Sequence, residues 1–269
     1  MADLPIAARD RIHSIDILRG LIIFLMVFVN DISGVAGTPT WLKHFPPGGD
    51  GMTIVDLVFP GFLFVMGMSI PSAIGKRLAK GIRPLSILPH VIARTAALLV
   101  IGVFMVNNPD DAHIGMRAGL WSLFMYVSVF LVWHCIPQKS NSAVRFSSIL
   151  RWMGILALIL LAVAFRDAEG KWLRTQWWGI LGLIGWAYLI ASAAYLVFRD
   201  NRTGLLGTMA LLFCAYVAFR EGLFDIRWVG GSALSSLPAI AVGGVFLGTL
   251  AMDRATSARD TWLTVMTFV

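Results

Sequence analysis

Residues 30–71 read NDISGVAGTPTWLKHFPPGGDGMTIVDLVFPGFLFVMGMSIP. The stretch starts with a polar pair, Asn30-Asp31, at the end of one apolar run. It passes through an irregular segment with several Gly and Pro residues and enters a second apolar run near Asp56. Apolar runs joined by a short polar connection indicate membrane helices, and charged groups beside hydrocarbon are costly enough to mark a functional site by default. We therefore expect this stretch to decide the fold and to carry the chemistry.

The composition excludes an ordinary soluble domain. Hydrophobic residues make up 58% of the 269 residues and charged residues only 14%, which is more apolar surface than a soluble fold of this size can bury. We predict an all-α, polytopic helical membrane protein with about eight complete transmembrane helices of ~20 residues each. The corresponding apolar runs cover residues 17–31, 53–75, 86–106, 118–136, 146–165, 178–198, 205–219 and 237–252.

The end of the sequence carries a ninth apolar run, which starts at Trp262 and reaches only to Val269. Such a run is too short to cross hydrocarbon. We therefore expect a truncated ninth helix, with further helices missing at the C-terminus. Because the polar connections are short and no internal repeat is evident, we predict a single transmembrane domain over residues 1–269.

The positive charge follows membrane topology. The net charge is +7, and the basic residues fall in short polar segments between the apolar runs. With the N-terminus placed in the cytoplasm, Lys and Arg favour the cytoplasmic segments by about two to one, as the positive-inside rule requires. The segment before Asp56 then lies outside the cytoplasm, and nucleic acid is a poor explanation of the charge.

His44 is the sharpest candidate for catalysis. Histidine exchanges a proton near neutral pH, and a nearby carboxylate can fix its tautomer. Asp31, Asp50 and Asp56 all lie close enough in sequence to supply that carboxylate. The alternative is a histidine in a solvated loop.

Other residues of the stretch offer binding groups. The Asn30 amide can donate to an oxyanion or to a sugar hydroxyl, and Asp31 beside it is a candidate for substrate binding. Asp56 fits either a site carboxylate or an acid that stabilises the N-terminus of a helix. A polar helix end at the membrane interface would account equally well for Asn30 and Asp31.

Two arginines suggest an anion site toward the cytoplasmic face. Arg19 follows Asp16 by three residues and can meet the phosphates of a cofactor, and Arg94 lies within the third apolar run. The positive-inside rule alone would produce much of this basic cluster. No two histidines have the spacing of metal ligands, so we predict no metal site.

Four stretches of the sequence resemble the heparan-alpha-glucosaminide N-acetyltransferase family and its bacterial relatives. The similarity is densest over residues 14–72. The stretches are SIDILRGLIIFLMVFVND, WLKH, DGMTIVDLVFPGFLFVMGMSIP and, further along, LRTQWWGILGLIGWAYL.

The resemblance implies a transmembrane enzyme that takes acetyl from cytoplasmic acetyl-CoA and places it on an amino sugar across the membrane. The family's catalytic histidine corresponds to His44, its neighbouring asparagine to Asn30 and the acid of its second helix to Asp56. The resemblance also implies a bacterial cytoplasmic (inner) membrane as the location.

We predict an acyltransferase that moves acetyl, or another acyl group, from acyl-CoA to an extracytoplasmic amino sugar or glycan. His44 is the general base, and Asn30 positions the thioester carbonyl or the acceptor. Asp56 or Asp50 orients the histidine. The alternative is a secondary transporter or flippase for a small polar solute, with Asp56 and Arg94 as coupling residues, and a third reading is an inactive scaffold. Direct transfer and an acyl-histidine intermediate both fit the sequence, which also leaves a homodimer open.

Overall fold

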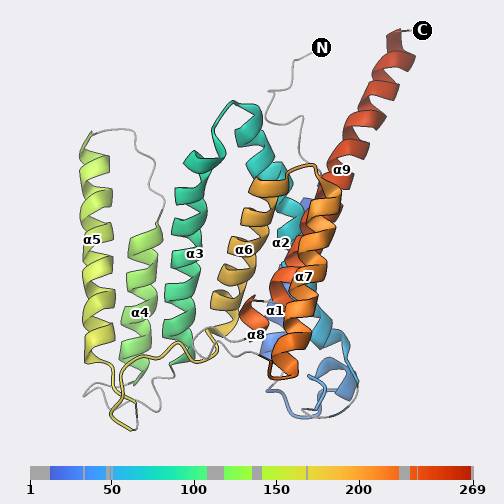
Figure 1. Ribbon diagram of the computed structural model, residues 1–269. Helices are drawn as coiled ribbons and strands as arrows, with labels where there is room; N and C mark the ends of the chain where they lie inside the picture. The colour runs from blue at the N-terminus through green and yellow to red at the C-terminus, as the bar shows by residue number, and fades with distance from the viewer. Residues whose placement is uncertain are drawn as a thin grey trace. The chain divides into compact units, whose positions relative to one another are not determined.

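The computed structural model describes residues 13–32, 34–46, 49, 51–107, 118–134, 141–167, 169–223, 231–234 and 236–267. Over these residues the protein is helical and contains no strand (Figure 1). The predicted all-α fold class is confirmed. The elements are α1 (His13–Ile32), η2 (Thr40–Leu42), α2 (Ile54–Ala79), α3 (Pro84–Val106), α4 (Ala118–Trp133), α5 (Asn141–Ala164), α6 (Gly179–Phe198), α7 (Arg202–Arg220), α8 (Gly231–Leu234) and α9 (Ser236–Thr267).

The described helices include five that are long and apolar enough to cross a bilayer, namely α2, α3, α5, α6 and α7. Two shorter apolar helices, Gly119–Trp133 within α4 and Ser236–Met252 within α9, accompany them. α1 has 20 residues and carries the charged residues Asp16, Arg19 and Asp31. The protein is therefore a polytopic helical membrane protein.

The end of the chain differs from the expectation in one respect. We expected an apolar run over 237–252 and a separate ninth run from Trp262, but α9 continues without a break from Ser236 to Thr267. The polar residues between the two runs include neither Gly nor Pro. Polar residues alone do not end a helix, so the helix continues through them.

The chain divides into two compact units. The first comprises residues 1–95 and 184–269, and the second comprises residues 96–183. The division falls within α3 and within α6. Every predicted site residue that the structure describes belongs to the first unit.

In the first unit, α1 and α2 form an antiparallel hairpin. Val29 near the end of α1 packs with Val55 and Val58 at the start of α2. Ile15 near the start of α1 packs with Val65 further along α2. The end of α1, the connection after it and the start of α2 therefore meet at one end of the hairpin.

The α2 and α9 helices touch backbone to backbone. A Cβ atom placed on Gly67 would lie 2.0 Å from the carbonyl oxygen of Ala241, and one placed on Gly244 would lie 2.0 Å from that of Phe64. Small residues let membrane helices approach this closely, which maximises van der Waals contact where no hydrophobic force drives association. The contact fixes α2, the helix that carries Asp56, against α9.

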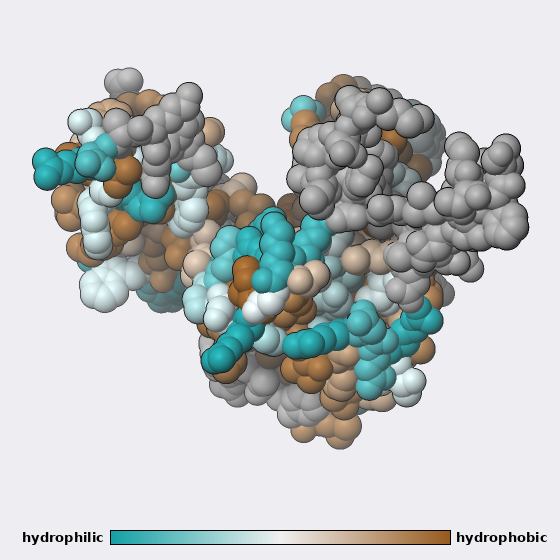
Figure 2. Space-filling model, turned by 90° about the horizontal axis from the view of Figure 1, so that it is seen from above, coloured by the Kyte–Doolittle hydropathy of each residue, from teal (hydrophilic) through white to brown (hydrophobic). Residues whose placement is uncertain are grey.

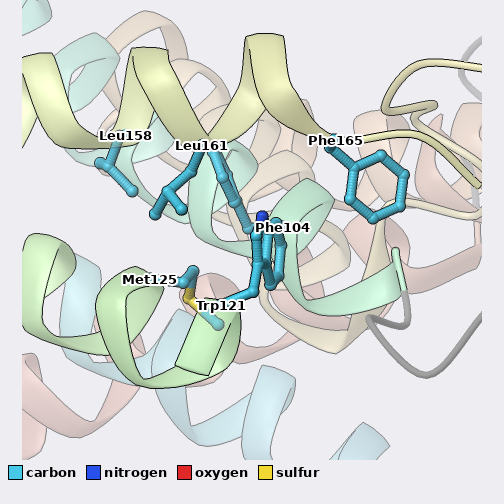
Figure 3. Close-up of a cluster of buried hydrophobic side chains, with 6 residues drawn as sticks. All are labelled: Phe104, Trp121, Met125, Leu158, Leu161 and Phe165. Carbon is cyan, nitrogen blue, oxygen red and sulfur yellow. The ribbon is translucent and has the colours of Figure 1, made fainter. Parts of the chain in front are cut away.

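The second unit is built around aromatic side chains. Trp121 of α4 is fully buried, and its ring centroid lies 5.9 Å from that of Phe104 in α3 and 5.5 Å from that of Phe165 after α5. Met125 from α4 and Leu158 from α5 belong to the same cluster (Figure 3). None of the predicted site residues lies in this unit.

The close contact between α2 and α9 can be tested with alanine substitutions. Gly67→Ala and Gly244→Ala should each destabilise the protein by about 1–3 kcal/mol or more, because the added methyl group meets backbone atoms that cannot swing away. Thermal unfolding in detergent would measure the effect. Gly207→Ala on α7 is the matched control, since nothing lies within 4 Å of a Cβ atom there. Equal unfolding midpoints for all three variants would contradict the close contact.

Candidate active site

The connection between α1 and α2 has a shape fixed by its own hydrogen bonds. The Thr38 hydroxyl lies 2.8 Å from the carbonyl oxygen of Val35 and 3.2 Å from that of Ile32. The η2 turn follows, and the amide of Lys43 donates to the carbonyl oxygen of Thr40 at 3.1 Å. These hydrogen bonds fix the turns by which the chain returns toward the start of α2.

Thr53, the N-cap of α2, ties this connection to the helix. Its hydroxyl donates to the carbonyl oxygen of Lys43 at 2.8 Å. The same hydroxyl lies 3.1 Å from Oδ2 of Asp56, and the Thr53 amide donates to that oxygen at 2.9 Å. An acid at the third position of a helix that accepts from the N-cap amide is one half of a capping box. The cap therefore fixes both the helix start and the Asp56 carboxylate.

The Asp56 carboxylate has protein partners on both of its oxygens. Oδ2 also accepts from the amide of Phe45 at 3.2 Å, while Oδ1 lies 2.7 Å from Nδ1 of His44. The backbone amides of Thr53 and Phe45 donate to one oxygen and His44 contacts the other, so the carboxylate cannot rotate without losing these bonds. The orientation of the His44 ring follows from that of the carboxylate.

The short contact to Asp56 sets the tautomer of His44. A carboxylate accepts hydrogen bonds, so Nδ1 of His44 carries the proton that points at Asp56, and in the neutral ring Nε2 is then the free base. The histidine side chain is 66% exposed and the aspartate side chain 25% exposed. The arrangement presents a basic nitrogen on an oriented ring at the surface, which is the geometry that general base catalysis requires.

The other predicted residues of this region lie nearby in the fold or outside the described residues. Asn30 and Asp31 occupy the last turn of α1, and both are exposed. Since the end of α1 packs on the start of α2, they lie at the same end of the hairpin as His44 and Asp56. Asp50, the alternative partner of the histidine, lies outside the described residues.

A basic cavity of about 600 Å³ lies along the first half of α1 and the later part of α2. Three cationic side chains line it, Arg19, Lys76 and Arg94. Arg19 donates to Asp16 at 2.9 Å, and the guanidinium of Arg94 lies 5.0 Å from the ring centroid of Tyr188. Both predicted anion-binding arginines therefore line the same cavity. Figure 2 looks onto the end of the molecule where α2 ends and α3 begins, and hydrophilic side chains gather there.

The rest of the cavity wall is mostly apolar, with Phe62, Met66 and Ile70 of α2 facing Ile23 of α1. A polar head could therefore be held by the arginines and lysine while a less polar chain lies along the wall. The arrangement suits a ligand with an anionic head and a long flexible arm.

One face of α1 links this cavity to the His44 end of the hairpin. Arg19, Ile23, Met26 and Asn30 follow one another at spacings of three or four residues, which places them on one helix face. The eleven residues from Arg19 to Asn30 rise by about 16 Å along the helix axis. The same face of α1 thus carries Arg19 at the cavity and Asn30 at the His44 end of the hairpin.

Sequence reasoning missed Thr53 and Tyr188. Thr53 stands three residues before Asp56, a spacing of N-cap and acid that signals a capping box, and it could have been found in this way. No sequence signal singled out Tyr188 from the other aromatic residues of α6. Within the described part of the chain, no three His, Cys, Asp or Glu side chains come close enough together to hold a metal ion.

The contribution of the Thr53 hydroxyl can be separated from that of the Thr53 backbone amide. Thr53→Val keeps the shape of the side chain but loses the hydroxyl, so the bond to Lys43 and one contact to Asp56 disappear. We expect a loss of about 1 kcal/mol of stability, the usual value of an N-cap side chain. Thermal unfolding would measure it, with Thr53→Ser as the control that keeps the hydroxyl. If valine and serine gave the same midpoint, the hydroxyl would not hold the connection.

Comparison with known proteins supports the resemblance seen in the sequence. Residues 11–222 match the family described as "Domain of unknown function (DUF5009)". The chain belongs to the DUF5009 family. The matched region contains every described site residue, from Arg19 to Arg94.

Two curated relatives carry a functional name. Over 180 residues the chain is 33% identical to heparan-alpha-glucosaminide N-acetyltransferase of Mus musculus. The aligned region covers 59% of the chain and 26% of that protein. The protein of the same name from Homo sapiens is 31% identical over 186 residues, covering 62% of the chain and 26% of that relative. The predicted resemblance to this acetyltransferase family is confirmed. The chain matches only about a quarter of the length of either relative.

Proposed function

We propose that this DUF5009 protein is a membrane acyltransferase that moves an acetyl group from acetyl-CoA to an amino sugar or a glycan. The observation that carries the proposal is the His44–Asp56 pair, an oriented imidazole at the start of a membrane helix. The similarity to two N-acetyltransferases supports the reaction class. The basic cavity and the α1 face that leads from it supply a place for a donor with phosphates and a flexible arm.

His44 is the base of the reaction. Nε2 of the ring takes a proton from the acceptor amine or hydroxyl as its nitrogen or oxygen attacks the carbonyl carbon of the thioester. The carbon–sulfur bond breaks, and the thiolate of coenzyme A leaves. The Asp56 carboxylate stabilises the imidazolium that forms at His44, because it already accepts from Nδ1. Thiolate is a good leaving group, so the reaction needs no metal ion.

Asn30 and Asp31 are assigned to the two substrates. The Asn30 amide donates to the thioester oxygen as negative charge develops there, or it holds the acceptor. The Asp31 carboxylate attracts an ammonium group on the acceptor before that group is deprotonated. Asp50, in the same connection, is a second candidate for a carboxylate near His44.

The donor occupies the basic cavity. Arg19 and Arg94 bind its phosphates, since guanidinium groups match phosphate oxygens in charge and geometry. We place the protein in a bacterial inner membrane with its N-terminus on the cytoplasmic side. Acetyl-CoA then enters from the cytoplasmic side. The acceptor meets His44 on the opposite side.

A transporter is the weaker proposal. A coupling residue changes its partners during transport, whereas the Asp56 carboxylate is held by the N-cap and by the loop on one oxygen and by His44 on the other. These contacts suit a fixed orienting role.

The base can be tested by acetyl transfer in membranes that contain the full-length protein. His44→Ala should lower kcat/KM by about 10²–10⁴-fold, the usual contribution of a general base. Asp56→Asn should lower it by about 10²-fold or more, because the amide can donate to Nδ1 and favour the wrong tautomer. Transfer of radiolabelled acetyl to glucosamine would measure both. His90→Ala, at an exposed histidine near the other end of α2, is the control and should retain activity. Full activity in the His44 variant would move the base to another residue.

The donor site makes a separate prediction. Arg19→Ala and Arg94→Ala should each raise the KM for acetyl-CoA by about tenfold or more, because each removes a charge-assisted contact to phosphate, and should leave the KM for the acceptor unchanged. Steady-state transfer assays would separate the two constants. Arg145→Ala on α5 is the control. An equal rise in both KM values would show that the arginines support the fold instead of the donor.

A further inference from the structure

We propose that the indole of Trp41 is a platform on which the ring of the acceptor sugar stacks beside His44. The inference rests on the proposed function, and it gives the amino-sugar acceptor a binding residue. Neither the sequence pattern nor the resemblance assigned a role to Trp41.

The loop holds Trp41 in a defined position. The residue is the middle one of the η2 turn, whose start follows Pro39 and whose end is fixed by the bond from the Lys43 amide to the Thr40 carbonyl. The Thr53 hydroxyl then holds Lys43 against the start of α2. A side chain on this turn therefore has a fixed place relative to Asp56 and His44.

The same turn directs the tryptophan outward. Trp41 is 60% exposed, while its neighbour Leu42 is half-buried and faces the protein. An indole exposed in this way offers a ligand a large rigid apolar surface with a polar N–H group at its edge. The fixed turn around Trp41 means that a ligand would meet a surface already in place, at little cost in ordering.

His44 lies in the same short segment as Trp41. His44 is the third residue after Trp41, which limits the separation of their Cα atoms to about 11 Å. The histidine is also exposed, and Nε2 is the nitrogen that does not face Asp56. A pyranose lying on the indole would thus place an amine within range of the base.

The chemistry of the indole favours a sugar ring as its ligand. One face of a pyranose presents C–H groups that pack on an aromatic plane, while the ring's hydroxyls and amine point sideways to polar partners. An indole adds an N–H donor at its edge. The polar surroundings of Trp41, with Thr40, Lys43 and His44 in the same short segment, supply such partners. A lipid chain lying on the indole would remove water from those polar groups without offering them hydrogen bonds.

The test compares two acceptors in membranes with the full-length protein. Trp41→Ala should raise the KM for glucosamine by about tenfold, a typical contribution of an aromatic contact, and Trp41→Phe should restore most of the loss. The KM for acetyl-CoA and the transfer to ethanolamine, an amine without a ring, should not change. A loss of equal size with both acceptors, or no change in KM for glucosamine, would overturn the platform and favour anchoring at the membrane interface.

A binding measurement separates this inference from the proposed function. Saturation-transfer NMR of glucosamine with the His44→Ala protein should show signals from the ring protons, and these should vanish in the His44→Ala, Trp41→Ala double variant. Binding that depends on Trp41 without any transfer by the native protein would support the platform and contradict the acyltransferase. Transfer by the native protein, together with sugar signals that persist in the double variant, would support the acyltransferase and contradict the platform.

Discussion

The contacts of one carboxylate hold the candidate site together. Asp56 belongs to the first turn of a membrane helix, and through one oxygen it accepts from the N-cap residue Thr53 and from Phe45 of the preceding loop. Its other oxygen lies against His44. A single group thus starts the helix, closes the loop and orients the histidine. Losing the carboxylate would release all three at once.

Helix packing in the rest of the first unit fixes the position of the Asp56 carboxylate. Close packing of α2 on α9 through Gly67 and Gly244 fixes the helix that carries Asp56. The α1–α2 hairpin brings Asn30 to the same end, and the face of α1 between Arg19 and Asn30 connects that end to the basic cavity. Fixed helices with polar groups at their ends are a common way to build precise sites, because helices position side chains better than free loops do.

Much of the fold could be predicted from the sequence, because the length and hydropathy of each run report directly on membrane helices. The position of a helix end was harder to predict. The polar residues between Met252 and Trp262 suggested a connection, but they contain no residue that stops a helix, and α9 runs through them. Their polar composition favours an aqueous environment, but polar residues can still form a helix.

The sequence proposed residues for the candidate site, but it did not show which of them contact one another. Sequence spacing offered three carboxylates as partners of His44, and only the folded loop shows Asp56 at hydrogen-bonding distance. The capping spacing of Thr53 and Asp56 was present in the sequence and could have favoured Asp56. The meeting of Arg94 with Tyr188 depends on helices far apart in the sequence, so no local pattern could have predicted it.

Catalysis at this site depends most on the tautomer of His44, with the proton on Nδ1 and the free base at Nε2. Nitrogen-15 NMR of the full-length protein labelled at histidine measures this directly, and the His44→Ala variant identifies the signal. We predict a protonated Nδ1 and an unprotonated Nε2 in the neutral ring, with the preference weakened in Asp56→Asn. A neutral His44 with its proton on Nε2, unaffected by the change at Asp56, would show that Asp56 does not orient the base.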